Sequence, residues 1–434
     1  MAEQDPRDRY RKSTEFLARA EAVIPLASQT FSKSRTALPV GISPLFLERG
    51  RGSRVWDVDG NEYIDFINGL LAISLGYNDP DVDAAVRAQL EEGVTFSLPH
   101  PIETELAEMI VAAVPCAEMV RYAKNGSDAT AGAIRIARAY TKRDRVAVCG
   151  YHGWQDWYIG STTRDLGVPD ATKALTHRFD YNDIGSLQTL LEQHPGEFAA
   201  VILEPMNTTW PAEGFLEDVA ETTRAAGALL VFDETITGFR FAMGGAQELF
   251  GVTPDLATFG KGIANGYPLA IVTGRGEYMR LMEDVFFSFT FGGETLSLAA
   301  AKAVIDKMRR EPVLDTIHRR GGTVLDGVTE RIAAHGVEGF CGVSGHPAWS
   351  FFTLAAAGPY DAYGLKTLYL QEMVARGILT LGTHNLSYAH SDGDIETLLG
   401  AYDAILQSLR AAVDRGDLPA RLHGEPLKPL FKVR

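Results

Sequence analysis

Between residues 119 and 274 the chain alternates short, mostly apolar segments with stretches of helical periodicity. The apolar segments lie at 119–123, 145–149, 199–203, 228–232, 256–259 and 269–273. Helical patterns at 184–193 and 216–226 separate some of them, and Ser127 is expected to cap an Ala-rich helix that ends near Tyr140. Apolar strands are buried on both faces, and strands joined through helices run parallel with right-handed crossovers. The pattern predicts an α/β fold with a mostly parallel central sheet.

The regions on either side of this pattern differ from it. Residues 44–66 alternate apolar and polar positions around Gly-containing turns, which is typical of a small antiparallel sheet. A second α+β unit is predicted from helical stretches at 322–335, 365–376 and 392–415 and strand-like pieces near 350–354 and 377–381. We expect residues 1–65 to contribute to a small domain, residues 66–320 to form a large domain and residues 321–434 to complete the small one.

Composition excludes several classes of protein. The chain has 434 residues and a formal net charge of −15, with no basic face for a nucleic acid. No apolar run is long enough to span a bilayer, so we expect no membrane contact. The cysteines Cys116, Cys149 and Cys341 are far apart and form no Cys-x-x-Cys pair. Neither a disulfide framework nor a bound metal is therefore expected, and a cytoplasmic location is predicted.

Two short runs carry the chemistry. Ala-Leu-Leu-Val-Phe-Asp-Glu ends at Asp233 and Glu234, and Ala-Thr-Phe-Gly-Lys-Gly places Lys261 between glycines. A carboxylate that ends an apolar strand costs free energy unless it is paired, although it can also simply bond the next loop. An amine in apolar surroundings becomes a nucleophile. Pyridoxal phosphate needs both groups, an amine for its Schiff base and an acid for its ring nitrogen. We therefore predict this cofactor, with Lys261, Asp233 and Tyr151 as catalytic residues.

Other residues fit the same cofactor. Gly126 and Ser127 lie between a strand and a helix, where backbone amides and a hydroxyl can bind phosphate, although such a pair is also an ordinary helix cap. Tyr151 follows the strand that ends at Cys149 and can stack on a flat ring, although it can also be a core aromatic. Ile236 can cover the other face of the ring.

Two further residues are candidates for the cofactor site. Asn207 lies beside Glu204-Pro205 at the end of a predicted strand, from which it can reach the ring hydroxyl. Thr290, in Phe-Thr-Phe-Gly-Gly, is a plausible second phosphate contact. His152, beside Tyr151, is expected to support the site rather than carry a proton.

In this order, the motifs resemble those of the class III pyridoxal-phosphate aminotransferases, and most closely the glutamate-1-semialdehyde aminomutase branch. The motifs are Gly-Ser at 126–127, Tyr-His-Gly at 151–153, Glu-Pro at 204–205, Asp-Glu at 233–234, Thr-Gly-Phe-Arg at 237–240, Gly-Lys at 260–261 and Thr-Phe-Gly-Gly at 290–293. The resemblance extends from about residue 30 to about residue 420.

The resemblance implies the fold of type I pyridoxal-phosphate transferases, with residues 66–320 as the cofactor-binding domain. It implies a homodimer whose cofactor lies at the subunit interface, with Thr290 reaching the phosphate from the other subunit. Tyr151 would stack on the ring, and Lys261 would carry the imine. Amino transfer would then be ping-pong, between a small amino donor and a carbonyl acceptor.

The residues expected to bind substrate match the aminomutase branch only in part. Arg35 lies where the aminomutase branch has an arginine that binds the substrate carboxylate. His384 and Asn385 stand where that branch has a glutamate, and Trp154 begins an unusually aromatic loop. Gly293-Glu294-Thr295 replaces the usual Gly-Asn-Pro.

These departures favour an aminotransferase that acts on an aldehyde or ketone, such as an aminosugar or polysaccharide precursor or a carboxylate-bearing semialdehyde. Two alternatives remain open. The first is an intramolecular aminomutase, and the second is a binding module that has lost catalysis on the same fold.

Overall fold

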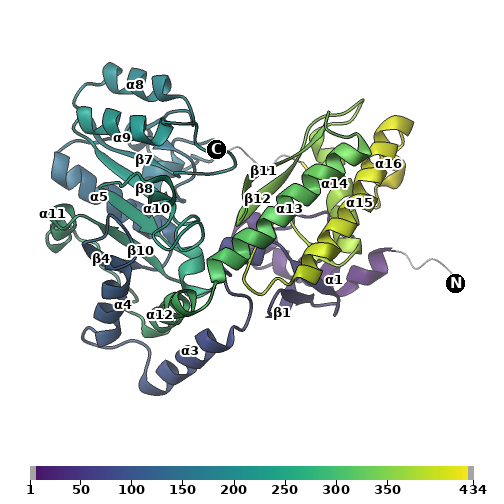
Figure 1. Ribbon diagram of the computed structural model, residues 1–434, viewed down its shortest axis with the longest axis horizontal. Helices are drawn as coiled ribbons and strands as arrows, with labels where there is room; N and C mark the ends of the chain where they lie inside the picture. Colours follow the sequence, from purple (N-terminus) through teal and green to yellow (C-terminus); the bar gives the residue numbers. More distant parts are fainter. Residues whose placement is uncertain (1–5, 429–434) are drawn as a thin grey trace. The chain divides into compact units, whose positions relative to one another are not determined.

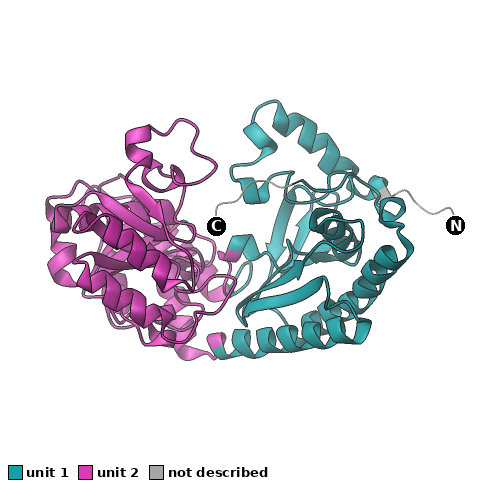
Figure 2. Ribbon diagram, turned by 90° about the horizontal axis from the view of Figure 1, so that it is seen from above, with its two compact units in different colours: residues 1–70, 75–79, 315–430 teal, residues 71–74, 80–314, 431–434 magenta. Residues whose placement is uncertain are grey.

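A computed structural model of the chain describes residues 6–428, with the elements labelled in Figure 1. It contains two compact units (Figure 2). Within the described residues, unit 1 comprises 6–70, 75–79 and 315–428, and unit 2 comprises 71–74 and 80–314. None of the helices in residues 6–428 is both long enough and apolar enough to cross a membrane.

Unit 2 is built around a seven-stranded sheet with the order β4-β10-β9-β8-β7-β5-β6. Its strands are β4 (Met119–Ala123), β5 (Arg145–Cys149), β6 (Thr176–Arg178), β7 (Phe198–Leu203), β8 (Leu229–Glu234), β9 (Leu256–Phe259) and β10 (Ala270–Gly274). Strands β5 to β9 pair in parallel, and β10 runs antiparallel to both of its neighbours. The predicted mostly parallel sheet is confirmed. The short strand β6 was not predicted, because it has only three residues.

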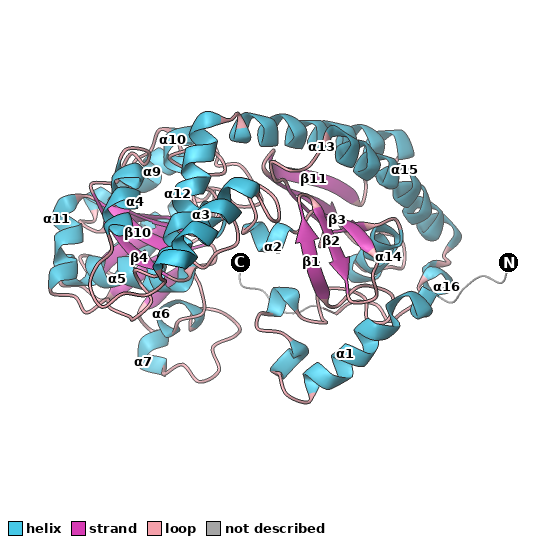
Figure 3. Ribbon diagram, turned by 90° about the horizontal axis from the view of Figure 1, so that it is seen from below, coloured by secondary structure: helices cyan, strands magenta, loops and turns pink. Residues whose placement is uncertain are grey.

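Helices cover both faces of this sheet (Figure 3). The helices of unit 2 are α3 (Pro80–Glu92), α4 (Pro101–Val111), α5 (Gly126–Thr141), α6 (Asp156–Ile159), α7 (Asp170–Lys173), α8 (Ile184–Gln193), α9 (Phe215–Ala225), α10 (Ala246–Phe250), α11 (Gly276–Met279) and α12 (Thr295–Arg310). Val146 and Val148 of β5 pack into the core beside α5, whereas Ala147 and Cys149 pack into the core beside α8 and α9. Alternate residues of one strand thus enter opposite cores, which explains why the strands are apolar throughout.

Unit 1 contains two smaller sheets, in the orders β1-β2-β3-β13 and β11-β12-β14. Their strands are β1 (Leu47–Arg51), β2 (Arg54–Asp57), β3 (Glu62–Asp65), β11 (Cys341–His346), β12 (Trp349–Leu354), β13 (Ile378–Leu379) and β14 (Thr383–Asn385). The antiparallel sheet expected within residues 44–66 is present as β1, β2 and β3. Strand β13 pairs in parallel with β3, so segments from both ends of the chain share one sheet.

The helices of unit 1 include one that runs through an expected boundary. They are α1 (Arg11–Glu21), α14 (Ala362–Ala375), α15 (Asp392–Arg415), α16 (Leu418–Arg421) and most of α13 (Val313–His335), while α2 (Asn68–Leu71) spans the boundary between the units. The sequence pattern predicted this helix from residue 322. The helix instead begins at Val313 and runs through Gly321 and Gly322, and a Cβ at Gly321 would lie 1.7 Å from the Pro347 carbonyl oxygen. Gly321 therefore permits a close backbone contact rather than ending a helix.

Candidate active site

The functional segments of unit 2 follow the carboxyl ends of its parallel strands. A cavity of about 300 Å³ lies at this edge of the sheet. It brings together six of the predicted residues, namely Gly126, Ser127, Tyr151, Asp233, Ile236 and Lys261. Ligands of open α/β sheets bind in crevices at this place, because the loops there are free to vary while the strands hold their positions.

One wall of the cavity is the N-terminus of α5. Asn125 is its N-cap and forms a capping box with Asp128, so the expectation that Ser127 caps this helix was wrong. Because Asn125 performs that role, the Ser127 side chain belongs to the cavity wall, where its Oγ accepts a hydrogen bond of 3.2 Å from the Trp154 amide. Backbone amides at such a helix end are an anion-binding group.

Gly153 keeps this wall open. Its φ is +106°, and a Cβ on it would lie 2.3 Å from Ser127 Oγ. Any other residue would therefore have to displace Ser127 or distort the loop. A glycine is thus required in Tyr-His-Gly because Gly153 packs directly against Ser127 at the N-terminus of α5.

Asp233 accepts hydrogen bonds on both oxygens of its carboxylate. Its Oδ1 accepts hydrogen bonds from Thr258 Oγ1 at 3.0 Å and from Thr235, through Oγ1 at 2.6 Å and the amide at 3.2 Å. Its Oδ2 lies 2.9 Å from His152 Nδ1. Burial by itself would raise the pKa of the Asp233 carboxyl, but the bonds from His152 and Thr235 outweigh burial and hold this pKa below its ordinary value. The acid is thus kept ionised.

His152 is fixed by two acceptors. Its Nε2 lies 3.1 Å from the Cys149 carbonyl oxygen, which can only accept, so Nε2 carries a hydrogen. Its Nδ1 faces the Asp233 carboxylate at 2.9 Å. His152 therefore contacts the acid directly and is held in place from both sides.

Lys261 begins the 3-10 helix η4 (Lys261–Ala264), directly after β9. Its φ is +46°, an uncommon conformation for a residue with a side chain. The turn is anchored by Ser74, whose Oγ donates to the Gly262 carbonyl at 2.7 Å and whose amide donates to Asn265 Oδ1 at 3.0 Å. Lys261 is thus placed by a rigid turn at the cavity wall.

Glu204 links two other predicted residues. Its Oε2 accepts hydrogen bonds from the Tyr151 amide at 2.9 Å and from Asn207 Nδ2 at 2.7 Å. Tyr151 also packs edge-on against Tyr158, with ring centroids 5.7 Å apart. Tyr151 and Glu204 line the cavity, whereas Asn207 lies behind Glu204 and is not among the lining residues.

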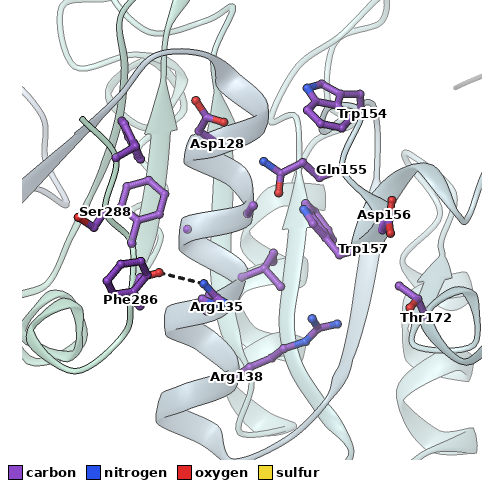
Figure 4. Close-up of a pocket in the computed structure, with 15 residues that line it drawn as sticks. Asp128, Arg135, Arg138, Trp154, Gln155, Asp156, Trp157, Thr172, Phe286 and Ser288 are labelled. Atoms are coloured by element: carbon purple, nitrogen blue, oxygen red, sulfur yellow. Dashed lines mark hydrogen bonds between the residues drawn. The ribbon is translucent and has the colours of Figure 1, made fainter. Parts of the chain in front are cut away.

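Besides Asn207, two predicted residues of unit 2 lie outside this cavity. Thr290 is exposed in a turn before α12. Trp154 lines a neighbouring groove of about 680 Å³ across α5, together with Trp157 and Arg135 (Figure 4). Ser127 and Asp128 are adjacent on α5, so the groove and the cavity begin on the same turn of that helix.

The other predicted substrate residues belong to unit 1. Arg35 forms an ion pair of 2.7 Å with Glu21. His384 is buried, with Nδ1 2.9 Å from Ser350 Oγ and Nε2 2.7 Å from Tyr402 Oη, and burial lowers its pKa to about 3. Asn385 is also buried and donates to the Ile67 carbonyl at 2.8 Å. Both ring nitrogens of His384 are thus engaged inside unit 1.

Several site residues carried no recognisable signal in the sequence. Thr258 bonds Asp233 because the register of β8 and β9 places these two residues opposite each other. Lys124 also lines the cavity, directly before the Asn125 cap. Strand register can predict a partner such as Thr258 only after the order of the strands is known.

The cavity therefore combines an anion-binding helix end, an ionised acid and a primary amine. This set fits a phosphorylated pyridine aldehyde, with amides for the phosphate, a carboxylate for a cationic ring nitrogen and an amine for the aldehyde.

The fold and this set of groups define a pyridoxal-phosphate-dependent transferase of fold type I. In agreement, the chain is similar to solved structures of pyridoxal-phosphate proteins. The PLP internal aldimine form of Sphingopyxis sp. MTA144 FumI protein is 28% identical with a TM-score of 0.87, covering 96% of this chain and 99% of that one. An omega-transaminase from Sphaerobacter thermophilus is 30% identical with a TM-score of 0.84, covering 92% and 99%.

The sequence comparisons identify the family. The profile of Aminotransferase class-III matches residues 37–384. The 3-aminobutyryl-CoA aminotransferase of Cloacimonas acidaminovorans (strain Evry) is 37% identical over 380 residues, covering 85% of this chain and 90% of that protein. A glutamate-1-semialdehyde 2,1-aminomutase of Syntrophobacter fumaroxidans is 35% identical over 401 residues, covering 85% and 92%. The chain belongs to the class III aminotransferases and is a pyridoxal-phosphate-dependent transaminase.

Proposed function

We propose that the chain transfers an amino group from a small amino donor to an aldehyde or ketone, with its cofactor held in the cavity around Lys261. One observation carries the proposal: the N-terminus of α5, Asp233 and Lys261 line a single cavity of about 300 Å³. Gly126 and Ser127 hold the phosphate, Tyr151 stacks on one face of the ring and Ile236 covers the other. Asp233 pairs with the ring nitrogen.

The cofactor, Asp233 and Lys261 have separate chemical roles in the proposed reaction. Bound pyridoxal phosphate supplies a cationic ring that withdraws electrons from the substrate carbon. Asp233 stays ionised through His152 and Thr235, so it favours a protonated ring nitrogen. Lys261 Nζ holds the cofactor until substrate arrives and then moves the substrate proton as a general base.

Thr290 and Asn207 enter the proposal through a homodimer. Thr290 is exposed and lies outside the cavity of its own chain, which supports a contact with the phosphate of the partner subunit. Asn207 donates to Glu204, which lines the cavity, and this link supports Asn207 as the proposed partner of the ring hydroxyl. Sedimentation of wild type and of a T290A variant with and without cofactor tests the dimer and the shared site.

For the acceptor, we propose a carbonyl compound with a carboxyl or thioester group close to the carbonyl. The names of two relatives, a 3-aminobutyryl-CoA aminotransferase and a glutamate-1-semialdehyde aminomutase, support this class of substrate. Arg35 is the proposed carboxylate ligand, because its guanidinium is partly exposed. Trp154, 66% exposed in the groove beside the cavity, is a proposed contact for the rest of the substrate.

A second candidate is intramolecular transfer, favoured by several aminomutases of 33–35% identity. The two reactions differ in what they consume, because an aminomutase needs no separate donor. Incubating the pyridoxamine form with a panel of semialdehydes, keto acids, β-keto thioesters and keto sugars distinguishes them. Turnover of glutamate-1-semialdehyde alone, with no donor ever consumed, would overturn the aminotransferase proposal.

We also propose a cytoplasmic location. The three cysteines, Cys116, Cys149 and Cys341, are all free and buried, which suits a reducing compartment. Fractionation of cells that produce the chain tests this.

The covalent assignment has its own test. Borohydride reduction of the holoenzyme followed by peptide mapping should label Lys261 and no other lysine. A K261A variant should lose both the visible absorbance of lysine-bound cofactor and all turnover. A label at any other position, or retained activity, would contradict the proposal.

A further inference from the structure

Lys124 occupies an unexpected position beside the proposed phosphate site. It is the first residue after β4 and precedes the Asn125 cap of α5, and it lines the same cavity as Ser127 and Lys261. Its ammonium nitrogen lies 3.0 Å from Glu294 Oε2. The side chain of Lys124 is 19% exposed and that of Glu294 is 14% exposed, so water screens this pair less than an ordinary surface pair.

Glu294 is itself held firmly. As the N-cap of α12 it accepts hydrogen bonds from the amides of Leu296 at 2.7 Å and Ser297 at 3.3 Å, and from Ser297 Oγ at 2.6 Å. Burial would raise the pKa of Glu294, but the bonds from Ser297 and Lys124 lower it overall. The carboxylate is thus an ionised, fixed anchor that positions the Lys124 ammonium.

We propose that Lys124 is a further phosphate-binding residue, held beside the N-terminus of α5 by Glu294, and that it selects the phosphorylated form of the cofactor. This rests on the cofactor site proposed above. A phosphate dianion at a helix N-terminus is stabilised further by an ammonium within reach, and a partly buried charge pair is stronger than one in water. A cofactor without phosphate gains nothing from Lys124.

The competing explanation is that Lys124 and Glu294 form a purely structural ion pair. The two explanations differ in whether neutralising Glu294 weakens the binding of ligands in the cavity. If the pair only ties the β4–α5 loop to α12, removing either charge should weaken every ligand of the cavity. If Lys124 binds phosphate, neutralising Lys124 weakens phosphorylated ligands alone. A glutamine at position 294 keeps an oxygen that can accept from Lys124 and so still positions it, while the competing negative charge is lost, so the binding of phosphorylated ligands stays unchanged or becomes tighter.

The test compares pyridoxal phosphate with pyridoxal on the full-length apoenzyme, by equilibrium titration of the visible absorbance of lysine-bound cofactor. K124M should raise the dissociation constant of pyridoxal phosphate by about tenfold or more, equivalent to about 1.4 kcal/mol, and leave that of pyridoxal unchanged. K124R should restore most of the difference. E294Q keeps a cap acceptor and should not weaken pyridoxal phosphate.

K124M leaves the Glu294 carboxylate without its cationic partner and can therefore fail to fold. In that case the double variant K124Q/E294Q, in which both side chains are neutral, replaces K124M in the titration. It should lose the preference for pyridoxal phosphate in the same way. Equal weakening of both ligands in K124M or in the double variant, or weakening of pyridoxal phosphate by E294Q, would overturn the role of Lys124. Absence of the absorbance from the wild-type titration would count against Lys261 and the proposed function instead.

Discussion

His152 Nδ1 lies 2.9 Å from Asp233 Oδ2, and both side chains are buried. His152 Nε2 lies 3.1 Å from the Cys149 carbonyl oxygen, so the imidazole is held from both sides. The bonds from His152 and Thr235 keep the pKa of the Asp233 carboxyl below its ordinary value, which suits an acid proposed to face a cationic ring nitrogen. His152, Thr235 and Thr258 together make a buried carboxylate tolerable, because they supply the bonds that water would otherwise provide.

Replacing His152 by Phe should shift the acid side of the pH–activity profile. In the wild type the pKa of Asp233 lies below its ordinary value, so the carboxylate stays ionised in acid that would protonate an ordinary aspartate. Without the His152 bond, burial dominates and raises this pKa, so activity should be lost at a higher pH. The pH dependence of kcat measures the shift.

The same linkage applies to stability. The lowered pKa of Asp233 stabilises the folded chain above the unfolded-state pKa, and this contribution is lost as the pH falls through the folded-state value. H152F should reduce the contribution. T258V removes one hydrogen bond to Asp233. It should shift the pH dependence of kcat and the pH dependence of stability in the same direction as H152F does, but by a smaller amount. An acid limb that stays in place in H152F would mean that His152 does not control this acid.

Gly153→Ala should weaken cofactor binding strongly. The new Cβ would lie 2.3 Å from Ser127 Oγ, and the backbone would keep a φ of +106°. We expect the dissociation constant of pyridoxal phosphate to rise by about tenfold or more, measured by titration of the apoenzyme. Gly167→Ala is the matched control, because Gly167 has a φ of +88° but nothing within 4 Å of the new Cβ. Equal effects of the two changes would assign the loss to backbone strain alone.

Glu234→Ala should destabilise unit 2. The carboxylate is buried and accepts from the amides of Ala246 at 2.6 Å and Gln247 at 2.9 Å, and from Thr237 Oγ1. Each donor left without a partner costs about 1–3 kcal/mol, so the free energy of unfolding should fall by several kcal/mol. Denaturant unfolding of E234A beside E213A, a change at an exposed glutamate, measures it. A loss no larger than that of E213A would show that the loop finds other partners.

The strands and the main site residues could be predicted because each carries its own local signal. Asp233 and Lys261 end or follow apolar strands, and parallel strands bring their carboxyl ends to one edge. The helix cap could not be assigned, because Asn125 and Ser127 are both good cap residues and only the backbone chooses between them. Thr258 and Lys124 depend on strand order and on a distant residue, Glu294, so no local pattern indicates them.

His384 illustrates the opposite case. The sequence offered it as a substrate ligand because it replaces a family glutamate, whereas the structure gives both of its nitrogens partners from β12 and α15. A single sequence does not distinguish a polar residue that faces a ligand from one that joins core elements, since both interrupt an apolar pattern.

Arg35→Met should affect substrate binding but not stability. Arg35 and Glu21 form a pair of 2.7 Å whose side chains are 46% and 40% exposed, and surface pairs of this kind contribute at most about 1 kcal/mol. A charged hydrogen bond to a substrate carboxylate is worth about 1.5–3 kcal/mol, so KM for carboxylate-bearing substrates should rise by at least about tenfold. Glu21→Gln keeps the guanidinium and should leave KM unchanged, measured by initial rates over a range of substrate concentrations. If both variants raise KM equally, the ion pair positions the loop and Arg35 does not bind the carboxylate. If neither does, another cation performs that role.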